Sequence, residues 1–199
     1  MAKKDIQDIS LFHDYKIYVP TRTIYMGSET HSTDEGESGT DYAMAERTIK
    51  NLEILNHLSK DPITIIMNNL GGDEYHCAAI IDSIKKSESH ITIEVRGHAM
   101  SAGSMILQSA DSRIMTANAT QMLHYGTWGS VNHSKTFQKV AKEGDRLDRW
   151  MEKLYLERIK EKQPHFTLAR LQRLLDHDTY LTAQQSVELG LADKILGEE

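Results

Sequence analysis

The sequence has few of the features that adapt a chain to an oxidising or membrane environment. Its single cysteine, Cys77, excludes a disulfide within the chain. No apolar run approaches the ~20 residues of a membrane span, and the first residues lack the apolar core of a signal peptide. We therefore expect a cytoplasmic protein that does not interact with a membrane.

Excess positive charge is also absent. Lys and Arg number 23 against 29 Asp and Glu, a formal net charge of −6, so the chain lacks the basic surface typical of proteins that bind nucleic acid. HExxH and paired-cysteine motifs do not occur, and there is no GxxxxGK[ST] loop for nucleotide hydrolysis. We expect no metal and no cofactor.

The 199 residues are 39% hydrophobic, which is ordinary for a globular protein and enough for one domain, residues 1–199. Only three prolines occur, each between patterned segments. Residues 1–20 form an N-terminal segment without a specific motif. The polar, acidic residues 28–41 predict an exposed, flexible loop.

Strand and helix patterns alternate along the chain. Short β-branched runs predict strands, and apolar residues at helical spacing predict helices. The expected strands are 63–67, 91–95, 113–115 and 121–125, with Gly97 ending the second; the expected helices are 42–60, 73–86, 101–109, 134–162, 167–175 and 182–189. This order predicts a βαβ unit and the α/β fold class.

Glycine stands at two expected strand-to-helix transitions. Gly71-Gly72 follows the first strand and permits positive φ and close approach of a ligand, although a simple tight turn has the same sequence. Ser101 lies at the start of a short helix, after Gly97. Its hydroxyl is either a helix cap or a nucleophile. Ser104, one turn later, would face another side of the helix.

A serine nucleophile requires a base and a group that orients the base. His124 stands at the end of an expected strand, where its ring either projects into a cleft or is hydrogen-bonded in the core. Asp176 and Asp178 both lie in the short link between two expected helices. Composition and spacing do not choose between these two aspartates.

Four segments taken together resemble the Clp protease proteolytic subunit family within the crotonase-like superfamily. They are Asn68-Asn69-Leu70-Gly71-Gly72, Gly97-His98-Ala99-Met100-Ser101-Ala102-Gly103, Met122-Leu123-His124, and Asp178-Thr179-Tyr180-Leu181-Thr182-Ala183 with Gly190-Leu191-Ala192-Asp193. The resemblance is best over residues 60–197. Tyr125-Gly126 replaces the Gln-Pro that usually follows the family histidine.

The resemblance implies a role for each matching residue. Ser101 corresponds to the nucleophile, His124 to the general base, and Asp178, rather than Asp176, to the acid that orients the base. Gly72 and Ala102 stand where the family supplies its oxyanion N–H groups. Gly71 and Gly126 match substrate-binding positions.

The resemblance also implies the crotonase-like ClpP fold, a repeated ββα superhelix, with a protruding handle helix within residues 126–162. It implies a self-compartmentalising serine endopeptidase of two stacked heptameric rings. Such a peptidase cleaves short peptides, or unfolded polypeptides supplied by an AAA+ unfoldase. Two alternatives are a crotonase-type acyl-CoA enzyme, which shares the two backbone donors, and a catalytically inactive ring subunit.

Overall fold

The computed structural model describes residues 3–27, 39–127, 129, 131 and 133–198. Most of the loop expected at 28–41 therefore lies outside the described residues. Three residues of the expected handle region, 128, 130 and 132, lie outside them as well.

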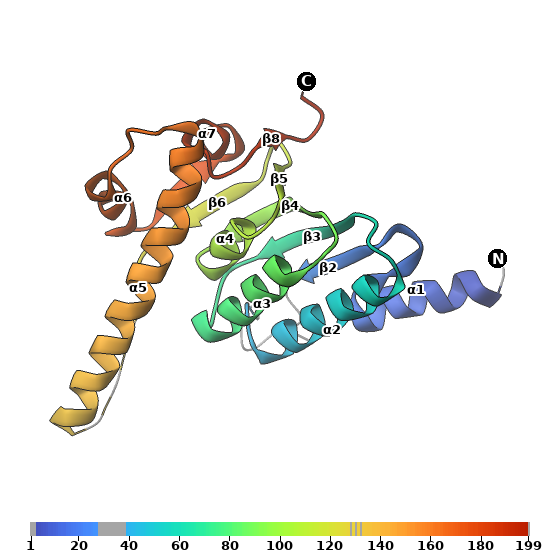
Figure 1. The fold of residues 1–199 in the computed structure, drawn as a ribbon, viewed down its shortest axis with the longest axis horizontal. Helices are drawn as coiled ribbons and strands as arrows, with labels where there is room; N and C mark the ends of the chain where they lie inside the picture. Colours follow the sequence, from blue (N-terminus) through green and yellow to red (C-terminus); the bar gives the residue numbers. More distant parts are fainter. Residues whose placement is uncertain (1–2, 28–38, 128, 130, 132, 199) are drawn as a thin grey trace.

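A twisted, mostly parallel sheet is the centre of the described structure (Figure 1). The main order is β1-β2-β3-β4-β5-β8, while β6 pairs with β4 and β7 pairs with β6. Among the described strands, the β1–β2 and β6–β7 pairings are antiparallel and the other pairings are parallel. The strands are β1 (Ile17–Tyr18), β2 (Thr23–Gly27), β3 (Ile63–Asn69), β4 (Ile91–Met100), β5 (Ser112–Met115), β6 (Thr120–Leu123), β7 (Thr179–Thr182) and β8 (Lys194–Ile195).

Helices surround this sheet and make the fold α/β, as the sequence predicts. α2 and α3 run side by side along one face of the sheet, and the N-terminal part of α5 projects well beyond it (Figure 1). The helices are α1 (Lys3–Tyr15), α2 (Tyr42–Leu58), α3 (Glu74–Lys86), α4 (Ala102–Leu107), α5 (Ser134–Lys162), α6 (Leu168–Leu175) and α7 (Ala183–Leu189), with a short 3₁₀ turn at Val19–Thr21.

The expected elements are confirmed, with boundary shifts of a few residues. The capping box of α7 is present: the Thr182 side chain accepts from the Gln185 N–H, and the Gln185 side chain accepts from the Thr182 N–H. Gly190 ends α7 in the left-handed region, at φ 92°. The sequence did not predict α1, β1, β7 or β8, because these elements are short or weakly patterned.

The prediction that Gly97 ends a strand is wrong. β4 continues through Gly97 to Met100, with Gly97 at φ 108°. The strand pairs with β5 over Thr92–Val95 and with β6 over His98–Met100, so Gly97 lies where β4 changes partner. A Cβ at Gly97 would lie 2.4 Å from Asn68 Oδ1, so the Asn68 side chain, which accepts from the His98 N–H, would have to move, and the positive φ would strain the new residue as well.

This change of partner brings several chain segments to one edge of the sheet. β3, β4 and β6 are parallel, so their carboxyl ends at Asn69, Met100 and Leu123 lie on the same side. β7 runs antiparallel to β6, with Thr179 opposite Leu123, so its first residue lies at that edge too. The residues that follow or precede these strand ends are therefore neighbours in space.

Candidate functional site

Three polar side chains meet at the shared edge of β4, β6 and β7. Ser101 Oγ lies 2.9 Å from His124 Nε2, and His124 Nδ1 lies 3.0 Å from Asp178 Oδ1. These are hydrogen-bond distances on opposite nitrogens of one imidazole. The imidazole thus connects a hydroxyl to a carboxylate, the arrangement by which a histidine can take a proton from a serine.

Ser101 occupies a strained backbone position between β4 and α4. Its φ is 51° and its ψ −120°, values that are uncommon for a residue with a side chain. Its N–H donates to the Met122 carbonyl of β6, 2.9 Å away. The side chain makes no capping bond to α4, so the hydroxyl is directed at His124. Strain of this kind is often found at functional sites.

Gly71 supports Ser101 from the neighbouring turn. Gly71 is buried at φ 101°, and a Cβ there would lie 2.6 Å from the Ser101 Cβ and 2.7 Å from the Met100 carbonyl oxygen. Its own N–H donates to Asn69 Oδ1 and its carbonyl accepts from the Thr40 N–H. Gly71 therefore sets the contact between the β3–α3 turn and Ser101.

Gly72, the next residue, lies at the surface of the same turn. It has φ 143° and forms a parallel β-bridge with Thr40. That bridge uses the Gly71 carbonyl and the Asp73 N–H, so it does not involve the Gly72 N–H. The Asp73 side chain caps α3 by accepting from the Tyr75 and His76 N–H groups.

Ala102 begins α4 directly after Ser101 and is buried. N–H groups in the first turn of a helix have no acceptor within that helix. Nearby, Cys77 Sγ lies 3.4 Å from the Ala102 carbonyl. Burial raises the pKa of the Cys77 thiol, so it stays protonated and does not compete as a nucleophile.

The structure distinguishes Asp178 from Asp176. Asp178 bonds to His124, whereas Asp176 is the exposed residue that ends α6. The Asp178 side chain is 57% exposed and that of His124 25% exposed. Ser104 is fully buried and accepts a bond from Gln121 Nε2, so it faces away from His124, as the sequence predicts. Gly126 lies two residues beyond His124 and is half-buried.

The role of Asn69 at this edge was not predicted from the sequence. Asn69 is fully buried, and its Nδ2 donates to Thr40 Oγ1 while its Oδ1 accepts from Gly71. Asn69 thereby fixes the Gly71–Gly72 turn and the segment that begins at Thr40. An asparagine at the end of an apolar strand was the available signal, since a buried amide needs partners.

A half-buried carboxylate, Glu74, lies two residues beyond Gly72 at the start of α3. Burial, together with the charges of Asp148 on α5 and Asp73, raises the pKa of Glu74 to about 7. The like-charged Asp148 also has a pKa above its usual value, mainly through burial. Protonation of Glu74 removes its repulsion with Asp148, which lies on the neighbouring helix α5.

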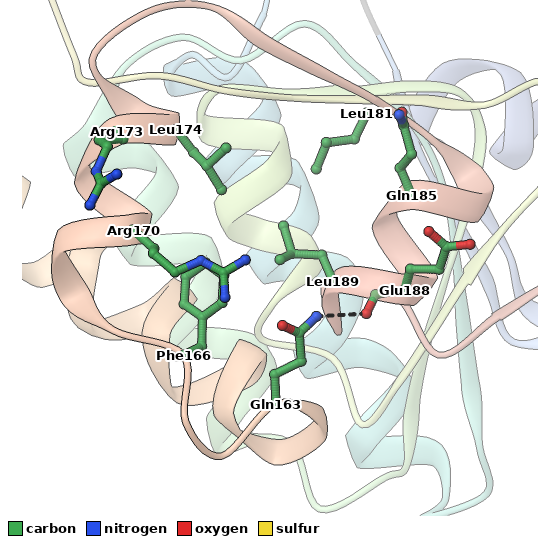
Figure 2. Close-up of a pocket in the computed structure, with 9 residues that line it drawn as sticks. All are labelled: Gln163, Phe166, Arg170, Arg173, Leu174, Leu181, Gln185, Glu188 and Leu189. Atoms are coloured by element: carbon green, nitrogen blue, oxygen red, sulfur yellow. Dashed lines mark hydrogen bonds between the residues drawn. The ribbon is translucent and has the colours of Figure 1, made fainter.

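A separate groove of about 420 Å³ lies between α6 and α7 (Figure 2). Its apolar lining includes Leu174 and Leu181, and the Arg170 guanidinium lies over the Phe166 ring at 4.5 Å from its centroid (Figure 2). Gln163 closes one end by donating to the Glu188 carbonyl. The residues of the Ser101 site do not line this groove.

Neither a metal centre nor a membrane helix is found in the part of the chain that the structure describes. In that part, no three His, Cys, Asp or Glu side chains are grouped so that they could hold a metal ion. No helix there is both long and apolar enough to cross a bilayer.

Comparison with known proteins finds relatives that are named as Clp protease proteolytic subunits. The chain is 26% identical over 163 residues, 81% of this chain and 79% of the relative, to the ATP-dependent Clp protease proteolytic subunit 2 of Pseudomonas aeruginosa. It is 29% identical to the ATP-dependent Clp protease proteolytic subunit of Chlorella vulgaris, over 66% of this chain and 64% of the relative. The ATP-dependent Clp protease proteolytic subunit 1 of Protochlamydia amoebophila is also 29% identical, over 68% of this chain and 65% of the relative.

The matches with the last two relatives span slightly less than two thirds of the relatives' own length. The family model described as Clp protease matches residues 35–199, which include every residue of the site described above. The chain belongs to the Clp protease family, a family of serine peptidases.

Proposed function

We propose that the chain is a serine endopeptidase in which Ser101 is the nucleophile, His124 the general base and Asp178 the acid that orients the base. The observation that carries this proposal is the unbroken series of hydrogen bonds from Ser101 Oγ through both nitrogens of His124 to Asp178 Oδ1. The family match supports it independently.

The reaction follows from this arrangement. Ser101 Oγ attacks the peptide carbonyl carbon while His124 Nε2 takes the hydroxyl proton. Asp178 accepts from Nδ1–H, holds the required tautomer and stabilises the imidazolium. When the C–N bond breaks, His124 gives its proton to the leaving amine, and an acyl ester remains on Ser101. Water then attacks that ester by the same route, releasing the acid and restoring the serine.

The negative oxygen of the tetrahedral intermediate needs hydrogen-bond donors. We assign this role to the N–H groups of Gly72 and Ala102, which flank Ser101 from two different turns. Gly71 packs under the Ser101 Cβ and sets the distance between these turns. We place the substrate backbone along the surface that runs from Gly71 to Gly126, beside the hydroxyl of Ser101.

The shape of α5 supports assembly into an oligomer. Its buried residues begin at Gly144, so none of the first ten residues of this 29-residue helix is buried, and Phe137 is 52% exposed. Most residues of this part of α5 are exposed, so its surface is available to another subunit. We propose that α5 is the handle that joins two stacked heptameric rings, with the site inside the chamber.

A closed chamber would restrict access to short peptides and unfolded chains. The relatives named above are ATP-dependent by name, and this chain has no nucleotide-binding loop of its own. We therefore propose that an AAA+ unfoldase supplies polypeptide substrates. A crotonase-type acyl-CoA enzyme would use carboxylates for acid–base work and would not need the serine–histidine bond.

Labelling with a fluorophosphonate probe, followed by mass spectrometry of the modified peptide, tests the proposal. We expect the wild type to be labelled at Ser101 and Ser101→Ala to be unlabelled, with peptide hydrolysis at least about 10³-fold slower. Ser104→Ala is the matched control and should still be labelled at Ser101. Unchanged peptide hydrolysis by Ser101→Ala would refute the assignment. Native mass spectrometry of the same sample measures the number of subunits and so tests the proposed rings.

A further inference from the structure

Glu152, in the middle of α5, accepts two hydrogen bonds from different parts of the chain. The Tyr125 hydroxyl donates to Glu152 Oε1 at 2.5 Å, and Gln172 Nε2 donates to the same oxygen at 2.9 Å. All three residues are partly buried. Glu152 Oε1 accepts from two donors at once, which a single side-chain oxygen can do through its two lone pairs.

The two donors lie in the segments that carry His124 and Asp178. Tyr125 directly follows His124, and its N–H donates to the carbonyl of Leu175, the last residue of α6. Gln172 lies in α6, and Asp178 follows three residues after the helix ends. One carboxylate oxygen thus connects α5 to both sides of the His124–Asp178 pair.

The His124–Asp178 contact needs such support. Asp178 is more than half exposed, and a polar contact at an exposed position adds little stability of its own to hold the two side chains together. The local bonds around it, such as Thr179 Oγ1 to the Leu174 carbonyl, join α6 only to β7. Through Tyr125 and Gln172, the carboxylate of Glu152 ties the residue after His124 and α6 to the long helix.

From this geometry we infer that Glu152 is a positioning residue, acting through Tyr125 and Gln172 to hold His124 and Asp178 in line with Ser101. The inference rests on the proposed function, because it matters only if these three residues catalyse the reaction. It also accounts for the tyrosine at position 125, because the Tyr125 hydroxyl connects the segment that carries His124 to α5.

A role confined to stability gives different expectations. Loss of Glu152 would then lower the melting temperature and leave the rate per folded molecule unchanged. A positioning role predicts a lower kcat with KM nearly constant, since the peptide still binds while the proton transfer is misaligned. It also predicts that a side chain of the same length with an uncharged acceptor oxygen, as in Glu152→Gln, retains activity.

Four variants of the full-length protein separate these outcomes: Tyr125→Phe, Glu152→Ala, Glu152→Gln and Glu157→Ala. Glu157 lies on the exposed side of the same helix, in a loose ion pair with Lys153 at 3.8 Å, and serves as the matched control. For each we would measure kcat and KM for a short peptide, the rate of fluorophosphonate labelling, the native mass and the melting temperature.

We expect kcat and labelling to fall by roughly 10- to 100-fold in Tyr125→Phe and Glu152→Ala. Glu152→Gln retains an acceptor oxygen and should stay within about threefold of the wild type, like Glu157→Ala. Wild-type kcat in Tyr125→Phe, which loses only a hydroxyl, would overturn the inference. So would Glu152→Gln as slow as Glu152→Ala. An unlabelled wild type would instead overturn the proposed function.

Discussion

Replacing Gly71 with alanine tests how closely the β3–α3 turn must approach Ser101. The new Cβ would lie 2.6 Å from the Ser101 Cβ, with the residue held at φ 101°. A left-handed conformation costs a residue with a side chain about 1–2 kcal/mol. Overlap in a packed site costs about 1–3 kcal/mol more. We therefore expect a loss of about 2–5 kcal/mol of the free energy of unfolding.

For a chain of this length, each kcal/mol lowers the melting temperature by about 2–4 °C, so Gly71→Ala should lower it by at least about 4 °C. The displaced Ser101 should also slow fluorophosphonate labelling at least about tenfold, at a temperature where the variant is folded. Thermal denaturation and labelling at matched protein concentration measure these two effects.

Gly197 provides the matched control. It also has a positive φ, 87°, but a Cβ there would meet no atom within 4 Å. Gly197→Ala should therefore show only the conformational cost of about 1–2 kcal/mol, with normal labelling. If Gly71→Ala were labelled as fast as the wild type, or cost no more than Gly197→Ala, the proposed contact with Ser101 would be wrong.

Three other predictions concern charged groups. Asp178→Asn should lower kcat by roughly 10²- to 10⁴-fold, whereas Asp176→Asn should stay within about twofold in the same peptide assay. Because the pKa of Glu74 is raised to about 7, the folded protein keeps a proton on this carboxyl between about pH 4.5 and 7, where the unfolded chain has released it. The free energy of unfolding therefore falls as pH rises through this range. After allowance for solvent screening of this half-exposed group, Glu74→Gln should raise the free energy of unfolding by about 1–2 kcal/mol at pH 8. At pH 4 the substitution should change it by almost nothing, and an equal gain at both pH values would contradict this expectation. Arg113 is 4% exposed and donates hydrogen bonds to Asp193, Gln108 and the Gly190 carbonyl. Arg113→Ala should therefore lower the free energy of unfolding by about 3–5 kcal/mol. A melting temperature within about 3 °C of the wild type would contradict that magnitude.

The strongly patterned elements could be predicted from the sequence because their signals are local. The run Ile63 to Met67 and the helical spacing of α3 depend on neighbouring residues only. The same is true of the capping box that begins α7. β7 could not be predicted this way, because its four residues form a strand only through pairing with β6.

The candidate site shows the same division. Glycine before Ser101 and a histidine at a strand end identified two of its members as residues of interest. The choice between Asp176 and Asp178 required resemblance to a family, since both lie in one short link. The roles of Asn69, Thr40 and Glu152 could not be predicted, because each depends on partners at least 20 residues away in the chain.

The sequence alone determined the α/β class, the order of the main elements and the glycine turns at Gly71-Gly72 and Gly190, since these follow from local hydrophobic periodicity and from backbone conformations that favour glycine. The tertiary structure decided how far β4 runs and which strand each half of it contacts. It also decided which aspartate meets His124. These outcomes depend on the pairing of distant segments, because a hydroxyl, an imidazole and a carboxylate form a site only when the sheet brings three strand ends to one edge.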